Sequence, residues 1–165
     1  MKYIPRNIDK HLQEWKEDES RKPLLLRGAR QVGKSSAVRH LGKSFKYYAE
    51  VNFEKEKGAK TFFEGDIKVH EIASKIAKYI DVPIVAGETL LFLDEVQECP
   101  EAIMALRFFK EDYPELHVIA AGSLLEFTLE ELPTYGVGRI RSLFMYPMSF
   151  DEFAIATGNQ GLLEM

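Results

Sequence analysis

Short apolar runs alternate with amphipathic segments along this chain of 165 residues. Residues 23–26, 89–93 and 117–121 are almost wholly apolar, which is typical of strands buried on both faces of a parallel sheet. Residues 46–53 and 140–146 are rich in aromatic and aliphatic side chains and also predict strands. The pattern therefore predicts five strands separated by other elements.

Amphipathic helices are predicted between these strands. Ile8, Leu12 and Trp15 recur at helical spacing, so they define one apolar face. Residues 54–65 are charged around two central phenylalanines and fit either a short helix or an irregular loop. The segments expected to be helical are 8–18, 34–42, 69–80, 100–113, 124–132 and 149–156.

Strands that alternate with helices predict an α/β domain in which helices cover both faces of a mainly parallel sheet. The length suits one domain. Within it we expect an N-terminal helix and linker (1–22), a core (23–157) and a frayed tail (158–165) at which the chain is truncated.

The first apolar run leads into Gly-Ala-Arg-Gln-Val-Gly-Lys-Ser at 28–35, which fits the phosphate-binding pattern G-x-x-x-x-G-K-[ST], or Walker A motif. Its glycines allow the backbone to wrap closely around a phosphate, and the following helix directs its positive end there. Lys34 is expected to reach the β- and γ-phosphates, and the Ser35 hydroxyl to bind Mg²⁺. The expected binding residues are Gly28, Ala29, Arg30, Gln31, Val32, Gly33, Lys34, Ser35 and Ser36.

A second apolar run, 90–93, is closed by Asp94 and Glu95, which is the Walker B pattern. A buried strand here delivers a carboxylate to the sheet edge at which ligands bind in α/β proteins. Asp94 is then a candidate Mg²⁺ ligand. Glu95, one residue further on, is a candidate base that polarises a water for attack on the γ-phosphate.

Further polar residues complete the candidate catalytic set. Ser123 follows the run 117–121 and would contact the attacking water or the γ-phosphate if its strand lies between the Walker strands; it also fits a helix N-cap. A cation at the γ-phosphate accelerates phosphoryl transfer. Arg139 is a candidate, in cis or in a neighbouring subunit, and Arg30 and Arg141 are alternatives. Residues 3–6 lead into the first predicted helix. Either this segment borders the nucleotide base or the helix only packs against the sheet, and the packing interpretation is favoured.

These motifs, together with Ala-Gly-Ser at 121–123, Gly-Arg at 138–139 and Tyr-Pro-Met-Ser-Phe-Asp-Glu-Phe at 146–153, resemble the AAA-type P-loop ATPases of bacteria and archaea. In that family the core is usually joined to a C-terminal domain of poorly known function, sometimes described as nuclease-like or winged-helix-containing. The resemblance implies sheet order 5-1-4-3-2, Ser123 as the first sensor and Glu95 as the catalytic base. Relatives continue beyond the position of Met165, so a second-sensor arginine in a helical lid has no counterpart here.

The resemblance implies ATP and Mg²⁺ as cofactors and hydrolysis coupled to a conformational change in a partner or in the C-terminal domain. A GTPase switch predicts Asn-Lys-x-Asp, which is absent from the sequence. A kinase must exclude water from the γ-phosphate, whereas Glu95 next to Asp94 is expected to activate a water there, which argues against a kinase. A non-hydrolysing nucleotide-binding or scaffolding module stays open. A homo-oligomer is a possible partner, and nucleic acid only through the missing C-terminal part.

Composition sets the remaining limits. The net charge of −4 gives no overall basic footprint for nucleic acid. Cys99 is the single cysteine, so no intrachain disulfide can form, and a cytoplasmic location is expected. The N-terminus lacks the apolar core of a signal peptide, and no apolar run is long enough to span a bilayer.

Overall fold

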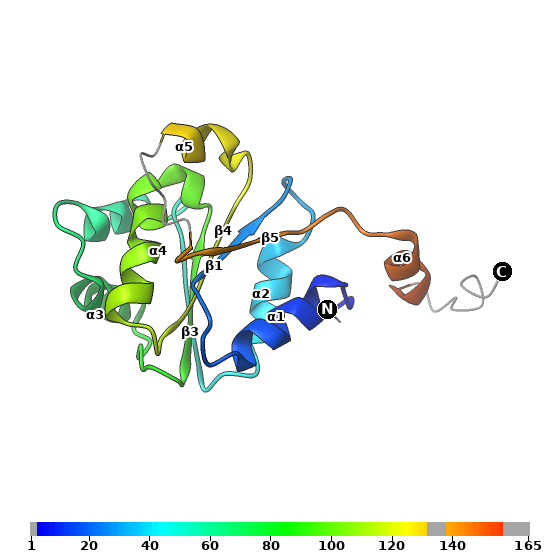
Figure 1. Cartoon of the computed structure of the whole chain (residues 1–165), viewed down its shortest axis with the longest axis horizontal. Helices are drawn as coiled ribbons and strands as arrows, with labels where there is room; N and C mark the ends of the chain where they lie inside the picture. The colour runs from blue at the N-terminus through cyan, green and yellow to red at the C-terminus, as the bar shows by residue number, and fades with distance from the viewer. Residues whose placement is uncertain (1–2, 132–137, 157–165) are drawn as a thin grey trace.

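The computed structural model describes residues 3–131 and 138–156, and its centre is a five-stranded sheet (Figure 1). Every neighbouring pair of strands is parallel. The order β2-β3-β4-β1-β5 confirms the predicted order, read from the other edge. The strands are β1 (Leu24–Arg27), β2 (Tyr47–Asn52), β3 (Thr89–Asp94), β4 (His117–Gly122) and β5 (Arg141–Phe144).

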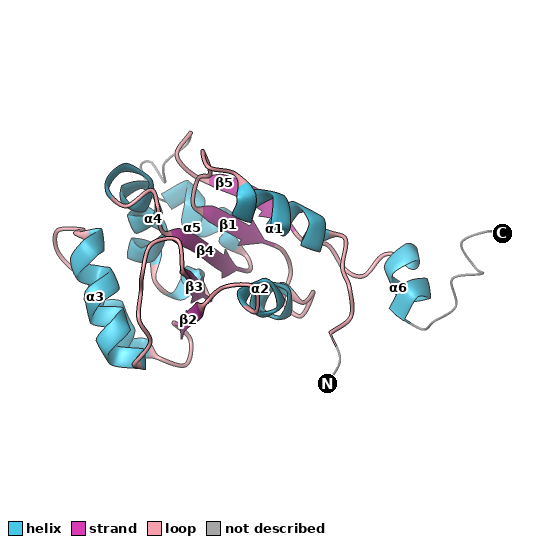
Figure 2. Cartoon of the chain, turned by 90° about the horizontal axis from the view of Figure 1, so that it is seen from below, coloured by secondary structure: helices cyan, strands magenta, loops and turns pink. Residues whose placement is uncertain are grey.

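Helices cover both faces of the sheet, and Figure 2 shows the two groups on opposite sides. Buried apolar side chains form two separate clusters, and each group of helices packs against the sheet through one of them. On one face lie α1 (Ile8–Glu17) and α2 (Lys34–Gly42); on the other lie α3 (Val69–Ile80), α4 (Pro100–Asp112) and α5 (Leu125–Glu131). The structure is thus a three-layer α/β/α domain of the predicted class.

Alternate residues of each inner strand enter different clusters, because successive side chains of a strand point to opposite faces. Leu24 and Leu26 pack with α1 and α2, whereas Leu25 packs with α3 and α4. All three are fully buried. This two-sided burial explains why the strand sequences are continuously apolar and show no alternation.

Residues 54–65 contain a 3-10 helix, η1 (Lys57–Phe63), and a second one, η2 (Val96–Glu98), follows β3. The fifth strand is shorter than the predicted 140–146 because β5 pairs on one side only, with the short strand β1. Helix α6 (Phe150–Ala156) lies apart from the sheet in Figures 1 and 2. The predicted tail, 158–165, lies outside the described residues.

Candidate functional site

The candidate residues gather at the edge of the sheet formed by the C-terminal ends of its strands, because β1, β3 and β4 all end there. Strand β4 lies between β1 and β3, with Leu26 paired to Ala121 and Leu93 paired to Ala120. The phosphate-binding loop follows β1, the acidic pair closes β3 and Ser123 follows β4. The structure therefore brings the Walker A, Walker B and sensor candidates to one edge.

The loop between β1 and α2 has the backbone that its glycines permit. Gly33 has φ 101° and Gln31 has φ 64°, both in the left-handed region. A Cβ atom at Gly33 would lie 2.9 Å from Nη1 of Arg6, and one at Gly28 would collide with the carbonyl oxygen of Met145. Close packing against backbone therefore requires glycine at position 28, and the left-handed backbone angle favours it at position 33.

Lys34 lies inside this loop and is buried. Its Nζ donates hydrogen bonds to the carbonyl oxygens of Gly28 (2.9 Å) and Ala29 (2.7 Å). Burial lowers the pKa of Lys34, and the nearby Glu95 and Asp94 carboxylates act in the opposite direction. The ammonium group is thus held at the centre of the loop by backbone carbonyls.

Ser35 and Asp94 join the two Walker motifs directly. Ser35 Oγ donates a hydrogen bond to Asp94 Oδ2 at 2.6 Å, and Asp94 Oδ1 accepts one from the Glu95 N–H at 2.9 Å. Asp94 is 2% exposed, and this burial raises its pKa despite both hydrogen bonds. A hydroxyl and a carboxylate form an oxygen-only donor set, which Mg²⁺ prefers.

Among the residues that the structure describes, no group of three or more His, Cys, Asp or Glu side chains is placed to hold a metal. Mg²⁺ does not need such a group, because it retains waters and binds through one or two carboxylates plus substrate phosphates. The residues present at Ser35 and Asp94 therefore fit a magnesium ion that a nucleotide also coordinates.

Glu95 lies at a sharp turn at the end of β3. Its backbone is left-handed (φ 55°, ψ 47°), which is uncommon outside glycine and which clusters at functional sites. Its Oε2 accepts a hydrogen bond from Gln97 Nε2 at 2.5 Å. The structure places Glu95 beside Asp94, at the edge that carries the phosphate-binding loop.

Ser123 is 2% exposed, and its hydroxyl has no hydrogen-bond partner among the described residues. The N-cap interpretation expected this hydroxyl to cap α5, and the structure shows that it does not. A buried hydroxyl without a partner is uncommon in proteins, so this group can still donate or accept a hydrogen bond. The Ser123 N–H donates to Gln97 Oε1 at 3.4 Å.

The three arginine candidates differ in position. Arg139 precedes β5 at the opposite edge of the sheet, where its Nε pairs with Glu111 Oε1 at 2.6 Å. Arg141 pairs with Leu24, the first residue of β1, so it also lies at that edge. The structure therefore does not bring Arg139 or Arg141 to the phosphate-binding loop of the same chain. Arg30 lies in the loop and is exposed.

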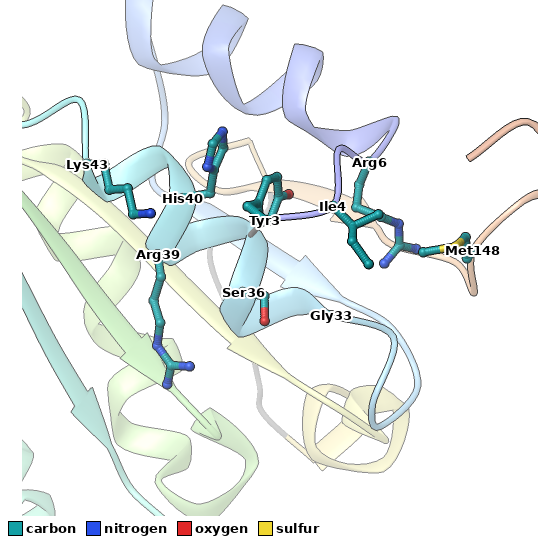
Figure 3. A pocket seen from close by; sticks show the side chains of 9 residues that line it. All are labelled: Tyr3, Ile4, Arg6, Gly33, Ser36, Arg39, His40, Lys43 and Met148. Atoms are coloured by element: carbon teal, nitrogen blue, oxygen red, sulfur yellow. The ribbon is translucent and has the colours of Figure 1, made fainter. Parts of the chain in front are cut away.

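A cavity of about 450 Å³ adjoins the loop and the start of α2 (Figure 3). The Tyr3 ring stacks on the His40 ring with centroids 3.9 Å apart, and both side chains line the cavity. The N-terminal segment thus lines a cavity beside the phosphate-binding loop. The lining residues are Tyr3, Ile4, Arg6, Gly33, Ser36, Arg39, His40, Lys43 and Met148.

Arg6 was not predicted as a site residue, but its guanidinium bonds to three separate parts of the chain. Its guanidinium donates to the carbonyl oxygens of Val32 (2.5 Å) and Tyr146 (2.8 Å) and to Glu152 Oε2 (2.8 Å). Glu152 also accepts the backbone N–H of Asn7 at 2.6 Å. Arg6 therefore connects the N-terminal segment, the phosphate-binding loop and α6.

A parallel sheet, a glycine-rich loop around a buried lysine and a serine–aspartate contact at the same edge define a P-loop protein of the nucleotide-binding α/β class. Residues 20–154 match the model of the AAA domain family. Since the match spans most of the chain, this protein belongs to the AAA domain family, as the resemblance implied. The nuclease-like C-terminal domain is not part of that match.

Solved structures support the same fold. The Walker-type ATPase PABY2304 of Pyrococcus abyssi aligns with TM-score 0.58 and 18% identity, covering 98% of this chain and 59% of that chain. A chain of the Drosophila ORC bound to DNA aligns with TM-score 0.54 and 15% identity, covering 94% and 48%. This chain therefore spans about half to three-fifths of these neighbours. No curated protein matches it in sequence.

One further property concerns membranes. Across residues 3–131 and 138–156, the structure contains no helix that combines the length and the apolar character needed to cross a bilayer.

Proposed function

We propose that this protein binds ATP with Mg²⁺ and hydrolyses it to ADP and phosphate. The observation that carries the proposal is the 2.6 Å hydrogen bond between Ser35 and Asp94, because it joins the phosphate-binding loop to the acidic end of β3. Glu95 follows Asp94 at the same edge, where a γ-phosphate bound in the loop would lie.

Binding of the nucleotide is assigned to the loop and the neighbouring cavity. The phosphates would contact the backbone N–H groups of residues 28–36 and Lys34, whose ammonium now bonds to two loop carbonyls. The cavity adjoins Gly33 and Ser36, so it would receive the nucleoside. The Tyr3–His40 stack gives it an aromatic wall, which suits a planar base.

Ser35 and Asp94 would hold the magnesium ion together with the nucleotide. When bound, Mg²⁺ neutralises charge that develops on the phosphate oxygens. Glu95 would accept the proton of the attacking water, and this role requires an ionised carboxylate within hydrogen-bond reach of that water. Ser123 would donate its unpartnered hydroxyl to the water or to the γ-phosphate.

Hydrolysis is proposed to drive a conformational change in a partner or in an attached domain. Arg6 supports this coupling because it contacts both Val32 in the loop and Glu152 on α6. The family resemblance supports a second copy of the chain as one partner.

Two variants test binding and hydrolysis separately. Lys34→Ala should abolish ATP binding measured by calorimetry, whereas Lys57→Ala, which changes an exposed lysine on η1, should not. Unchanged affinity in Lys34→Ala would contradict the site.

Glu95→Gln should retain binding and lose about 10²–10⁴-fold in turnover, as expected for loss of a general base. Binding without turnover in the unchanged protein would favour the non-hydrolysing module.

A further inference from the structure

Gln97 is placed to connect the candidate base to the end of β4. It lies on η2, two residues after Glu95, and its side chain is half-buried. Its Nε2 donates to Glu95 Oε2 at 2.5 Å, and its Oε1 accepts the N–H of Ser123 at 3.4 Å. The carboxamide thus bridges two residues of the proposed hydrolytic site.

Only one orientation of this carboxamide satisfies both neighbours. A carboxylate accepts hydrogen bonds and a backbone N–H donates them, so the NH₂ group must face Glu95 and the oxygen must face Ser123. A flipped amide would oppose two acceptors at one end and two donors at the other. The chemistry of the neighbours therefore fixes the orientation of Gln97.

The end of β4 provides space for this bridge. A Cβ atom at Gly122 would lie 2.7 Å from Gln97 Oε1 and 3.1 Å from Leu125 Cδ2. Gly122 has no left-handed backbone angle, so a side chain there would be opposed by the Gln97 carboxamide and not by backbone conformation. This is a second observation, independent of the hydrogen bonds, that the carboxamide occupies a shaped position.

We propose that Gln97 is a positioning residue that holds the Glu95 carboxylate in a fixed relation to Ser123. This inference rests on the proposed ATP hydrolysis. Glu95 lies at a strained, left-handed turn, and the Gln97 carboxamide restrains its side chain by a hydrogen bond to Oε2.

Steady-state turnover and ATP binding distinguish positioning from general structural support. Gln97→Ala should lower kcat by roughly 10- to 100-fold, the usual effect of losing a group that orients an active side chain, while ATP affinity changes less than about twofold. Gly122→Ala should give the same selective loss, because it displaces the carboxamide from the β4 side. Glu98→Ala, which changes an exposed neighbour on η2, is the matched control and should behave as the unchanged protein.

A kcat unchanged in Gln97→Ala, or an equal loss of kcat and ATP affinity, would each overturn the proposal, because loss of a positioning contact lowers kcat selectively.

If the unchanged protein binds ATP without turnover, the hydrolysis proposal fails and a separate measurement decides the role of Gln97. Unfolding of Gln97→Ala, Glu95→Ala and the double variant forms a double-mutant cycle. The two substitutions should be non-additive if Gln97 restrains Glu95. Additive effects would show that the two side chains are not coupled, which would overturn the inference.

Discussion

Glu152→Ala should destabilise the protein far more than loss of an ordinary surface ion pair. The Arg6 and Glu152 side chains are 10% and 7% exposed, so their ion pair is shielded from water. Removing one partner of a buried pair costs about 3–5 kcal/mol, because the other charge is left without compensation. Arg6 keeps its bonds to the Val32 and Tyr146 carbonyls, so we expect the lower end, about 3 kcal/mol.

Urea unfolding at neutral pH measures this loss. Glu88→Ala is the control, because Glu88 pairs with Lys46 at 3.7 Å while the two side chains are 44% and 62% exposed. An exposed pair of this kind contributes about 0–1 kcal/mol. Equal losses in Glu152→Ala and Glu88→Ala would refute the argument that the Arg6–Glu152 pair stabilises the fold.

The same pair predicts a link to nucleotide binding. Arg6 donates to Val32 in the phosphate-binding loop, whereas the side chain of Glu152 bonds to Arg6, Asn7 and Ser149. ATP affinity should therefore fall more in Arg6→Ala than in Glu152→Ala.

Burial alone would raise the pKa of Glu152, but the hydrogen bonds from Ser149, Asn7 and Arg6 outweigh it and lower that pKa. The stabilisation is thus present above the ordinary glutamate pKa and is lost as the pH falls through the lowered value.

Three other changes have defined outcomes. Burial lowers the pKa of His117 from 6.5 to about 4, so the unfolded chain binds a proton at a higher pH than the folded protein does. The free energy of unfolding should therefore fall by about 3 kcal/mol as the pH falls from 6.5 to about 4, and urea unfolding of His117→Leu should lack this dependence. Asp94→Asn should raise the melting temperature of the nucleotide-free protein at neutral pH, because burial disfavours the carboxylate, and should remove the Mg²⁺ dependence of ATP binding in calorimetry; a lower melting temperature would contradict this. Arg139→Ala should leave ATP affinity unchanged, because its guanidinium pairs with Glu111 at the opposite edge; a loss of turnover that grows with protein concentration would instead place Arg139 in the site of a second copy.

The sequence predicted the sheet and the Walker motifs because both depend on local patterns. Continuous apolar runs identify buried strands, and glycine, lysine and serine at fixed spacing identify the loop. The order of strands needed the family resemblance, since spacing along the chain does not specify which strand lies beside β1. The insertion of β4 between β1 and β3 is what places Ser123 near the loop.

The residues that the sequence did not identify act across long separations or through side-chain orientation. Arg6 and Glu152 are 146 positions apart, and no local pattern connects them. The Ser149–Glu152 spacing predicts a helix cap, and the structure contains both reciprocal bonds of that cap, at 2.9 and 3.1 Å. The pairing of the same carboxylate with Arg6 appears only in three dimensions. Gln97 lies only two residues after Glu95 in the sequence, yet its contact with Glu95 depends on the turn at Glu95.

Arg139 shows why chemical suitability is not sufficient to assign a site residue. A glycine followed by an arginine in a turn suits a catalytic cation, but a parallel sheet sorts its loops by strand end. Loops after strands reach the ligand edge, and loops before strands reach the opposite edge. Arg139 precedes β5, so it lies at the far edge from the phosphate-binding loop of its own chain. Arg6 approaches the loop because its segment crosses beside residues 32–33, and that path is set by tertiary packing alone.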